Sequence, residues 1–300
     1  MARVSIGLPV YNGERFLPDA IGSLLRQTFE DFELIISDNA STDTTGEICR
    51  GYAERDRRIR YLPLKENIGS APNFNRVAQL SSTPYFSWAA HDDVWAPRYL
   101  ERCLEALDRD PSVVLAYTRA SVIDESGDHV RDFGAGPDLL SPSPYVRLHR
   151  WLFQPHVAYH AFFGVMRAPG LAQVLPLANC AGNDELFLAH LLLLGKYYEV
   201  PECMFFNREH RAKASSTYRG VEQSIWFDPR NQGKVPIPRT RRIAGWLKAV
   251  KGAPMSLSDR LRCLVLLARW TYWYSPALAG EMWRNSQHWA ARVLGSRHRQ

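Results

Sequence analysis

The N-terminal part of the chain alternates short apolar runs with segments of helical periodicity, and this alternation restricts the possible folds more than any other feature. Each run is apolar along its whole length, which is typical of strands buried on both faces of a parallel sheet. Between them, segments such as FLPDAIGSLLRQ place apolar residues on one face of a helix. We therefore predict an α/β fold with a mostly parallel sheet and helices on both faces. The predicted strands cover residues 3–10, 32–38, 59–64 and 84–90.

Polar turn residues follow each of the four predicted strands. In chain order these clusters are PVYNG, SDNASTD, KENIGSAPN and HDD. Any one of them is also ordinary turn chemistry, because Asn, Asp, Ser and Gly favour turns for local reasons. The C-terminal ends of parallel strands lie along one edge of a sheet, where ligands of α/β proteins bind. Four such clusters in this order predict a polar binding site at that edge.

Composition and cysteine usage indicate a folded chain from a reducing compartment. With 300 residues, 46% of them apolar, the chain can build one large α/β domain with an appendage. Its five cysteines are scattered and form no C-x-x-C pair, which argues against a disulfide framework or a zinc site. The sequence enters a strand at once, so we expect no signal peptide and a cytoplasmic location.

Longer motifs make the chain recognisable. VSIGLPVYNGERFLPDAIGSLLRQTFEDFELIISDNASTD, ENIG and the HDD cluster are followed by GNDELFLAHLLLLG (182–195) and FNREHRAKASS (206–216). Together these motifs resemble the inverting glycosyltransferases of family 2 over residues 3–216. The resemblance implies a GT-A fold, a nucleotide-diphosphate-sugar donor, a glycan or lipid-linked acceptor hydroxyl, and Mn²⁺ or Mg²⁺ as cofactor. A nucleotidylyltransferase is the alternative, but its G-x-G-T-R loop for a triphosphate is missing from this sequence.

Asp92 and Asp93 are adjacent carboxylates that repel each other unless something compensates their charge. By the resemblance, Asp93 is a metal ligand, and Asp92 contacts the donor ribose or a metal-bound water. The alternative is that one of them caps a helix beginning near Pro97. His91 stands where many relatives have a further aspartate, and we expect it to be packed rather than a ligand. His210 matches a position that can supply a third metal ligand, with a solvated histidine as the alternative.

The second cluster begins with Asp38 and Asn39, where relatives often have two carboxylates. The second of these commonly binds the base. Asn39 offers an amide donor as well as a carbonyl acceptor, so the base identity stays open. Pro9 and Tyr11 should line the base pocket, with the Tyr11 ring either stacking on the base or only packing. The residues expected to bind the nucleotide sugar are Pro9, Tyr11, Asn12, Asp38, Asn39, Asn67 and Asp92.

Asp184 is the predicted catalytic base. An acceptor hydroxyl is a poor nucleophile until its proton is removed, and a positioned carboxylate contributes roughly 10²–10⁴ in rate. By the resemblance the base is the second residue of an acidic pair, here Asn183–Asp184, and Glu185 is the competing candidate. The alternative is that these acidic residues only favour a helix N-terminus. Candidate contacts for the diphosphate are Arg208, Arg211, Lys213, Ser215 and Ser216.

The C-terminal part differs in charge and in aromatic content from the rest of the chain. From Arg239 onwards there are twelve Lys or Arg residues against Asp259 and Glu281, a balance of +10, and five of the nine tryptophans. We predict a catalytic domain over residues 1–228 and a basic helical extension over residues 229–300. A nucleic-acid partner would leave the acidic cluster unexplained, so we expect none. Leu257, Leu261, Leu264, Val265, Ala268 and Tyr272 form an apolar stripe at helical spacing, with Trp283 and Trp289 further on. This extension either packs on the domain or lies on the inner face of an anionic membrane.

Overall fold

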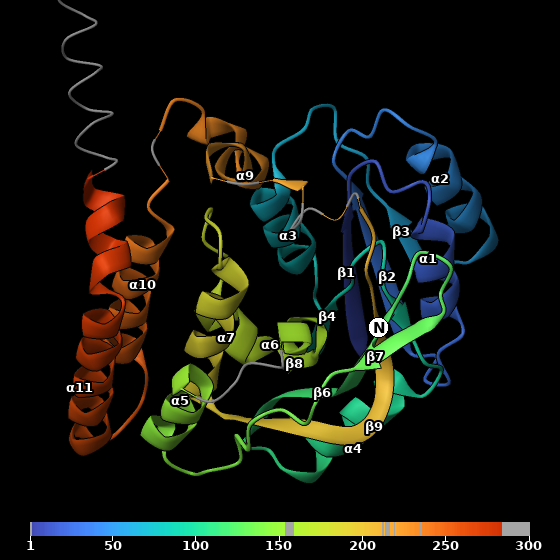
Figure 1. The fold of residues 1–300 in the computed structure, drawn as a ribbon. Helices are drawn as coiled ribbons and strands as arrows, with labels where there is room; N and C mark the ends of the chain where they lie inside the picture. The colour runs from blue at the N-terminus through green and yellow to red at the C-terminus, as the bar shows by residue number, and fades with distance from the viewer. Residues whose placement is uncertain are drawn as a thin grey trace, which may run out of the picture.

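A computed structural model describes residues 2–153, 159–211, 213, 217–218, 220–234 and 236–283. These residues form a nine-stranded sheet in the order β3-β2-β1-β4-β8-β6-β9-β5, with β7 paired to β6 (Figure 1). The strands are β1 (Val4–Val10), β2 (Phe32–Asp38), β3 (Ile59–Tyr61), β4 (Tyr85–Trp88), β5 (Val94–Trp95), β6 (Val113–Ile123), β7 (His129–Asp132), β8 (Val165–Arg167) and β9 (Lys196–Arg208). The helices are α1 (Leu17–Leu25), α2 (Thr45–Arg55), α3 (Ser70–Gln79), α4 (Tyr99–Arg109), α5 (Pro144–Phe153), α6 (Ala168–Val174), α7 (Asn183–Leu194), α9 (Gly220–Phe227), α10 (Pro238–Gly252) and α11 (Leu257–Trp273). Two short 3₁₀ turns are η1 (Tyr159–Phe163) and η2 (Pro229–Asn231).

The N-terminal half of the sheet is parallel, as the apolar runs predicted. β1 pairs in parallel with β2 and β4, and β2 pairs in parallel with β3. Every residue of β1 is buried, because helices cover both faces of this central strand. The registers bring the C-terminal ends of β1, β2 and β4 to the same edge of the sheet, with Val10 opposite Asp38.

The other half of the sheet is mixed, and the sequence did not predict it. β8 is antiparallel to both β4 and β6, whereas β9 is parallel to β6. β5 follows Asp93 directly and pairs antiparallel with the end of β9, which places Val94 opposite Phe206. The chain segment that carries the two carboxylates is therefore fixed against the C-terminal end of β9.

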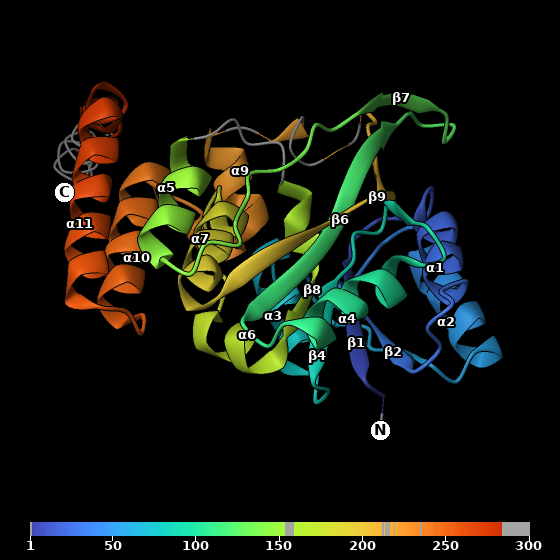
Figure 2. The ribbon, with the colours of Figure 1, turned by 90° about the horizontal axis from the view of Figure 1, so that it is seen from below.

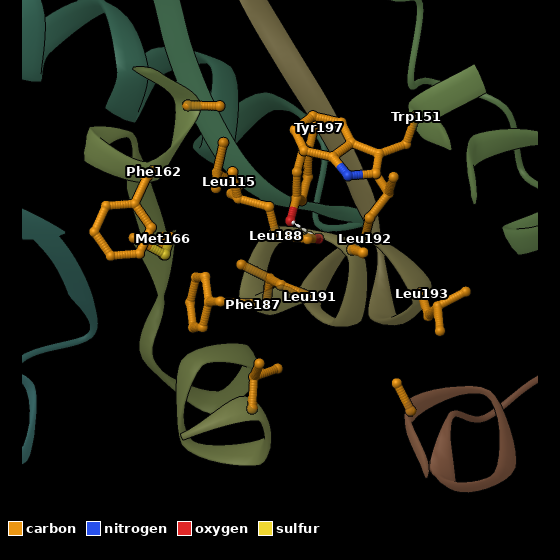
Figure 3. Close-up of a cluster of buried hydrophobic side chains, with 14 of the residues drawn as sticks. Leu115, Trp151, Phe162, Met166, Phe187, Leu188, Leu191, Leu192, Leu193 and Tyr197 are labelled. Carbon is orange, nitrogen blue, oxygen red and sulfur yellow. Dashed lines mark hydrogen bonds between the residues drawn. The ribbon is translucent and has the colours of Figure 1, made fainter. Parts of the chain in front are cut away.

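Two apolar clusters lie on opposite faces of the sheet. In β2, Leu34 and Ile36 belong to the cluster with α1, α2 and α4, and Ile35 belongs to the cluster with α3, α6 and α7. α7 is apolar all round because sheet and helices surround it. Figure 3 shows its leucines in the second cluster, where Tyr197 of β9 donates a hydrogen bond to the carbonyl oxygen of Leu188 at 2.6 Å.

The C-terminal helices pack on this second cluster. α10 lies against α7, and α11 lies against α10 and α5 at the edge of the molecule (Figures 1 and 2). Trp246 and Trp270 are buried there in the same cluster as the α7 leucines, as the packing alternative predicted. None of the described helices is both long and apolar enough to cross a membrane.

The stripe that the sequence singled out on this extension does not face the domain. Its members Leu257, Leu261, Val265 and Tyr272 are between 56% and 77% exposed, Ala268 is exposed, and Leu264 is partly buried. α11 packs through another set, Cys263, Leu266, Leu267 and Trp270. Trp283 is 65% exposed, and Trp289 lies outside the described residues.

Candidate active site

The loops that follow β1 and β2 are joined by hydrogen bonds of Asn12. Its backbone is left-handed, with φ at 50°. The N–H of Thr42 donates to Asn12 Oδ1 at 2.9 Å, and the N–H of Asn12 donates to Ser41 Oγ at 2.9 Å. These bonds connect the loop after β1 to the segment that precedes α2, which begins at Thr45. Tyr11, beside Asn12, is 39% exposed, whereas Pro9 is buried within β1.

Asp38 is buried at the end of β2, beside that loop. The hydroxyl of Tyr61, the last residue of β3, donates to Asp38 Oδ2 at 2.8 Å. The N–H of Ser41 donates to Asp38 Oδ1 at 2.9 Å. Both carboxylate oxygens therefore accept bonds, and each retains a lone pair for a ligand donor. Burial and the Asp38 carboxylate raise the pKa of Tyr61, so its hydroxyl stays a donor.

Asn39 fixes the third loop of this edge, which contains Asn67. Its Nδ2 donates to Asn67 Oδ1 at 3.0 Å and to the carbonyl oxygen of Gly69 at 3.2 Å. Its Oδ1 accepts the N–H of Ile68 at 2.9 Å. Gly69 has φ at 92°, and a Cβ there would lie 2.7 Å from the carbonyl oxygen of Phe227, so only glycine fits. Asn39 and Asn67 thus have a loop-positioning role in addition to the predicted contact with the donor.

Asp92 and Asp93 are both buried between β4 and β5. Asp93 Oδ1 accepts bonds from Asn207 Nδ2 at 3.0 Å and from the N–H of Arg208 at 2.9 Å. α4 begins at Tyr99 with no side-chain cap, so the alternative in which one of these carboxylates caps that helix is wrong. The pairing of β5 with β9 holds the two carboxylates together at the edge of the sheet.

Arg208 binds the backbone around the carboxylates. It is 2% exposed, and its guanidinium donates to the carbonyl oxygens of Asp92 at 3.0 Å, Asp124 at 3.3 Å and Glu125 at 3.2 Å. It also pairs with Asp19 at 3.0 Å. Arg208 is therefore a structural residue, and the expectation that it clamps the diphosphate is wrong. Ser215 and Ser216 lie outside the described residues.

His210 joins the same cluster through its imidazole. Its Nε2 lies 2.9 Å from Asp92 Oδ2, and its ring lies 4.7 Å from that of Phe16. The solvated alternative is wrong, because the His210 side chain is only 5% exposed. His91 packs against Gly13, where an added Cβ would lie 2.7 Å from the imidazole, which agrees with the packed role predicted for it.

The electrostatics of the two carboxylates differ although they are neighbours. Burial raises the pKa of Asp93, and the Asp92 charge raises it further. The charge of Lys213 and the hydrogen bond from the Arg208 N–H lower it in part. Burial alone would also raise the pKa of Asp92, but His91 and the bond from His210 hold it below its ordinary value. Lys213 Nζ donates to Asn207 Oδ1 at 3.1 Å and to the carbonyl oxygen of Arg208 at 2.8 Å. Its ammonium is one of the charges that compensate the pair.

The residue types at this point fit a divalent cation. Within the described ranges, no three His, Cys, Asp or Glu side chains are already arranged as a metal site. However, carboxylate oxygens suit Mg²⁺ and Mn²⁺, and an imidazole nitrogen is acceptable to Mn²⁺. His210 Nδ1 is buried and has no hydrogen-bond partner among the described residues, whereas its Nε2 faces Asp92. Asp92, Asp93 and His210 could thus supply part of a coordination shell.

Asp184 occupies the first turn of α7, after Gly182, which has a left-handed backbone. Burial raises the pKa of Asp184, against backbone N–H groups of the helix start and the charge of Arg242. The neighbouring Glu185 forms a salt bridge with Arg242 of α10. Of the two candidate bases, Glu185 is thus committed to a cation, and Asp184 is the better placed to accept a proton.

Sequence reasoning missed Tyr61 and Arg242. Tyr61 lies inside the strand predicted over residues 59–64, whereas β3 ends at Tyr61, so the predicted strand did not place this hydroxyl at the sheet edge. Arg242 lies 57 residues from Glu185, and no local pattern connects the two. The described structure joins Asn39 to Asn67 and Asp92 to His210 by hydrogen bonds, whereas Asp38 is bonded to Ser41 and Tyr61. Asp184 lies in the first turn of α7, where the charge of Arg242 on α10 lowers its pKa against burial.

A family comparison agrees with this geometry. The model described as Glycosyl transferase family 2 matches residues 5–175, more than half of the chain. The chain belongs to glycosyltransferase family 2. The predicted recognition is thereby confirmed, and the matched residues include β1 to β4 and the Asp92–Asp93 pair.

Curated relatives in this family are similar over about half of the chain. An uncharacterized glycosyltransferase of Rickettsia conorii is 36% identical over 140 residues, which are 46% of this chain and 22% of the relative. The putative teichuronic acid biosynthesis glycosyltransferase TuaG of Bacillus subtilis is 31% identical over 138 residues, which are 46% of this chain and 54% of TuaG. The chain therefore spans about half or less of the length of these relatives.

Solved structures show the same fold. S. aureus TarS in complex with UDP superimposes with a TM-score of 0.65 at 15% identity, over 92% of this chain and 73% of TarS. The mannosyltransferase PcManGT from Pyrobaculum calidifontis, in complex with GDP-Man and Mn²⁺, gives a TM-score of 0.56 at 16% identity, over 98% of this chain and 79% of PcManGT. The predicted GT-A fold with a C-terminal helical region is confirmed.

Proposed function

We propose that this glycosyltransferase transfers a sugar, with inversion, from a nucleoside-diphosphate sugar to an acceptor hydroxyl. The observation that carries the proposal is the buried Asp92–Asp93 pair at the carboxyl edge of a parallel sheet. Asp93 keeps a raised pKa despite the neighbouring Lys213, so a cationic ligand group beside the pair would be favoured. The UDP and UDP-GlcNAc complexes of TarS and the GDP-Man complex of PcManGT support a nucleotide-sugar donor.

The nucleotide is assigned to the loops after β1, β2 and β3. Asp38 presents buried acceptor oxygens, and Tyr11 presents a partly exposed ring beside them. A base that stacked on Tyr11 could donate to Asp38, and Asp92 would accept from the ribose. Asn39 would contact the base only through lone pairs that its loop bonds leave unused. Pro9, Asn12 and Asn67 would shape this pocket through the backbone they hold in place.

A divalent cation is assigned to Asp93, with Asp92 beside it and His210 as a third candidate. When bound, it would neutralise the charge that develops on the departing diphosphate. The chain's own part is to hold the two carboxylates rigidly, through Arg208 and Asn207, at the place where the diphosphate must lie. PcManGT, whose complex contains Mn²⁺, supports a cation of this kind.

Asp184 is proposed as the base that removes the acceptor proton. Its burial raises its pKa and so favours proton uptake, while Arg242 keeps the neighbouring Glu185 in an ion pair. In an inverting displacement the acceptor oxygen attacks the face of the sugar opposite the diphosphate. One carboxylate on that side is sufficient, and its oxygen takes the hydroxyl proton as the new bond forms.

The acceptor is proposed to be a glycan or a lipid-linked sugar of the cell envelope. The name of TuaG, which refers to teichuronic acid biosynthesis, supports this class. The test is a panel of UDP-, GDP- and TDP-sugars with Mn²⁺, scored by release of the free nucleoside diphosphate. One donor should be hydrolysed well above the others, with a product of inverted anomeric configuration when an acceptor is present. Retained configuration, or release of pyrophosphate from a nucleoside triphosphate instead, would overturn the proposal.

A further inference from the structure

The outward face of α11 is an unpartnered apolar surface among the described residues. At about 100° per residue, its exposed apolar positions fall within an arc of about 80°. The opposite arc is the face buried against α10 and α5. α11 is thus apolar on two separate faces, and Figures 1 and 2 show it at the edge of the molecule remote from α1 and α2. The outward apolar stripe consists of Leu257 (73% exposed), Leu261 (56%), Val265 (62%), Ala268 and Tyr272 (77%).

Two exposed arginines border this outward apolar stripe. Arg262 and Arg269 are seven residues apart and so lie on one line along the helix, between the stripe and the buried face. Arg269 lies over the ring of Trp273, 5.8 Å from its centroid, and Trp273 is itself 58% exposed. Arginine with tryptophan and tyrosine at an apolar–polar boundary is typical of helices that lie in a membrane interface.

The two acidic residues of this region offset only part of its positive charge, and one of them, Glu281, is paired with Arg239. Glu281 is 1% exposed and accepts the N–H of Arg239 at 3.0 Å. Asp259 accepts bonds from Ser143 Oγ at 2.8 Å and Ser256 Oγ at 3.0 Å. No further Asp or Glu occurs after Arg239, and residues 284–300 add four arginines. In the described part of this region, the cations beside the apolar stripe are Arg262 and Arg269, and both are exposed.

We propose that the outward apolar stripe of α11, with Arg262 and Arg269, docks on an anionic lipid surface. The aliphatic side chains would enter the boundary between headgroups and acyl chains, and the arginines would contact lipid phosphates. The two arginines would suit a nucleic acid, but the apolar stripe beside them would have no partner on it. A second copy of the chain would match the apolar stripe, and sedimentation velocity distinguishes this occupant from a lipid surface.

This docking goes beyond the proposed sugar transfer and has a consequence for it. α10 contacts both α11 and α7, the helix that carries Asp184. A lipid surface at α11 would therefore lie on the side of the molecule where the base is, and an acceptor anchored in that surface would approach from there. Because docking is measured without any sugar, its failure and a failure of the proposed function are distinguishable.

Co-sedimentation of the full-length protein with vesicles tests the proposal. Vesicles of equal parts phosphatidylglycerol and phosphatidylcholine should bind the protein at low salt, at least about tenfold better than phosphatidylcholine alone, and high salt should release it. Leu261→Ser with Val265→Ser should weaken partitioning at least about tenfold. Arg262→Gln and Arg269→Gln should each weaken it about fivefold. Val130→Ser on β7 and Val221→Ser on α9 are matched controls, since these valines are 52% and 51% exposed elsewhere, and both should bind as the wild type.

Several outcomes would overturn the proposal. Wild-type protein that stays in the supernatant with the anionic vesicles at low salt is one. Unchanged binding by the Leu261→Ser, Val265→Ser variant is another. If sedimentation velocity shows a wild-type dimer that the same variant converts to a monomer, the face is an interface between copies. Equal donor hydrolysis by the wild type and the variant in solution shows that the site is intact in the protein under test.

Discussion

Asp184 and Glu185 are neighbours of the same charge, yet their surroundings assign them different chemistry. Glu185 pairs with Arg242, while Asp184 remains at the helix start with the backbone N–H groups. In both, burial is the largest cause of a raised pKa. A carboxyl with a raised pKa is a better proton acceptor once ionised, and an ion-paired neighbour is a poorer one. The two residues therefore make different predictions.

Asp184→Asn should reduce transfer by at least about two orders of magnitude, as loss of a general base does. Nucleotide binding should be retained, because Asp184 belongs to the first turn of α7 and not to the loops after β1 to β3. Initial rates with a saturating donor, together with a titration of the nucleoside diphosphate, separate the two effects. If this variant turns over normally while Glu185→Gln is inactive, the base is one residue further along.

Arg242→Gln should move the acid limb of the pH–rate profile to higher pH. Catalysis needs ionised Asp184, and the Arg242 charge lowers the pKa of both Asp184 and Glu185 against burial. Loss of a nearby opposite charge raises a carboxyl pKa by about 1–3 units. Tyr159 and Cys180 also interact with Asp184, and burial raises the pKa of both, so they stay neutral at the relevant pH.

A variant that combines Arg242→Gln with Glu185→Gln shows whether Arg242 acts through its charge. Glu185→Gln alone removes a negative neighbour, so it should shift the limb to lower pH, and combining it with Arg242→Gln should return the limb toward the wild type. Lys251→Gln removes an exposed positive charge from the same helix and should leave the profile unchanged. Identical acid limbs in the wild type, the two single variants and the double variant would contradict an electrostatic role for Arg242 and leave it a packing residue.

At the scale of one element, α11 shows that spacing alone does not decide which face of a helix is buried. Both of its faces have apolar residues at helical intervals, and the helix packs through the one with Trp270. The Trp270 ring lies 4.1 Å from Tyr274 and 4.8 Å from Trp246, so it fills the joint between α10 and α11. We attribute the burial of this face to Trp270, whose large ring packs against a second buried tryptophan, Trp246.

Trp270→Ala should lower the free energy of unfolding by about 3–5 kcal/mol, as truncation of a buried aromatic residue does. Leu261→Ala on the outward face should change it by less than about 0.5 kcal/mol. Denaturant unfolding followed by circular dichroism measures both. Equal losses in the two variants would mean that the outward face is covered in solution.

At the scale of the whole molecule, the candidate site is built from loops that are distant in sequence. Arg208 of β9 joins the backbone of Asp92, Asp124 and Glu125 to the side chain of Asp19. One buried guanidinium thus connects four segments around the two carboxylates. A ligand that contacts several of these loops should stabilise the entire fold rather than one element.

Nucleoside diphosphate with Mn²⁺ should therefore raise the unfolding free energy, by about 2.7 kcal/mol at one hundred times the dissociation constant. Thermal unfolding should show this as an increase of several degrees for one of UDP, GDP or TDP. EDTA should abolish the increase, and Asp93→Ala should abolish both the increase and transfer. Full activity of the wild type in excess EDTA would refute the assignment of a metal to Asp93.

The sequence by itself determined the parallel half of the sheet and the order of the polar clusters. Continuous apolar runs can be buried only where both faces of a sheet are covered, and parallel strands bring their C-terminal ends to one edge. Asp38, Asn39 and Asp92 could be located there because each lies at the end of a predicted strand or within two residues after it. Both the apolar runs and the polar residues at their ends can be recognised from a few consecutive residues.

Only the tertiary structure decided the contacts between segments that are far apart. The pairing of β5 with β9 placed Arg208 behind the carboxylates instead of at a diphosphate, and it brought His210 to Asp92. The ion pair between Glu185 and Arg242, and the choice of the buried face of α11, likewise depend on how α10 and α11 pack on α7. Such contacts arise because burying aromatic and apolar surface fixes the approach of whole elements, and no single segment of the sequence specifies that approach.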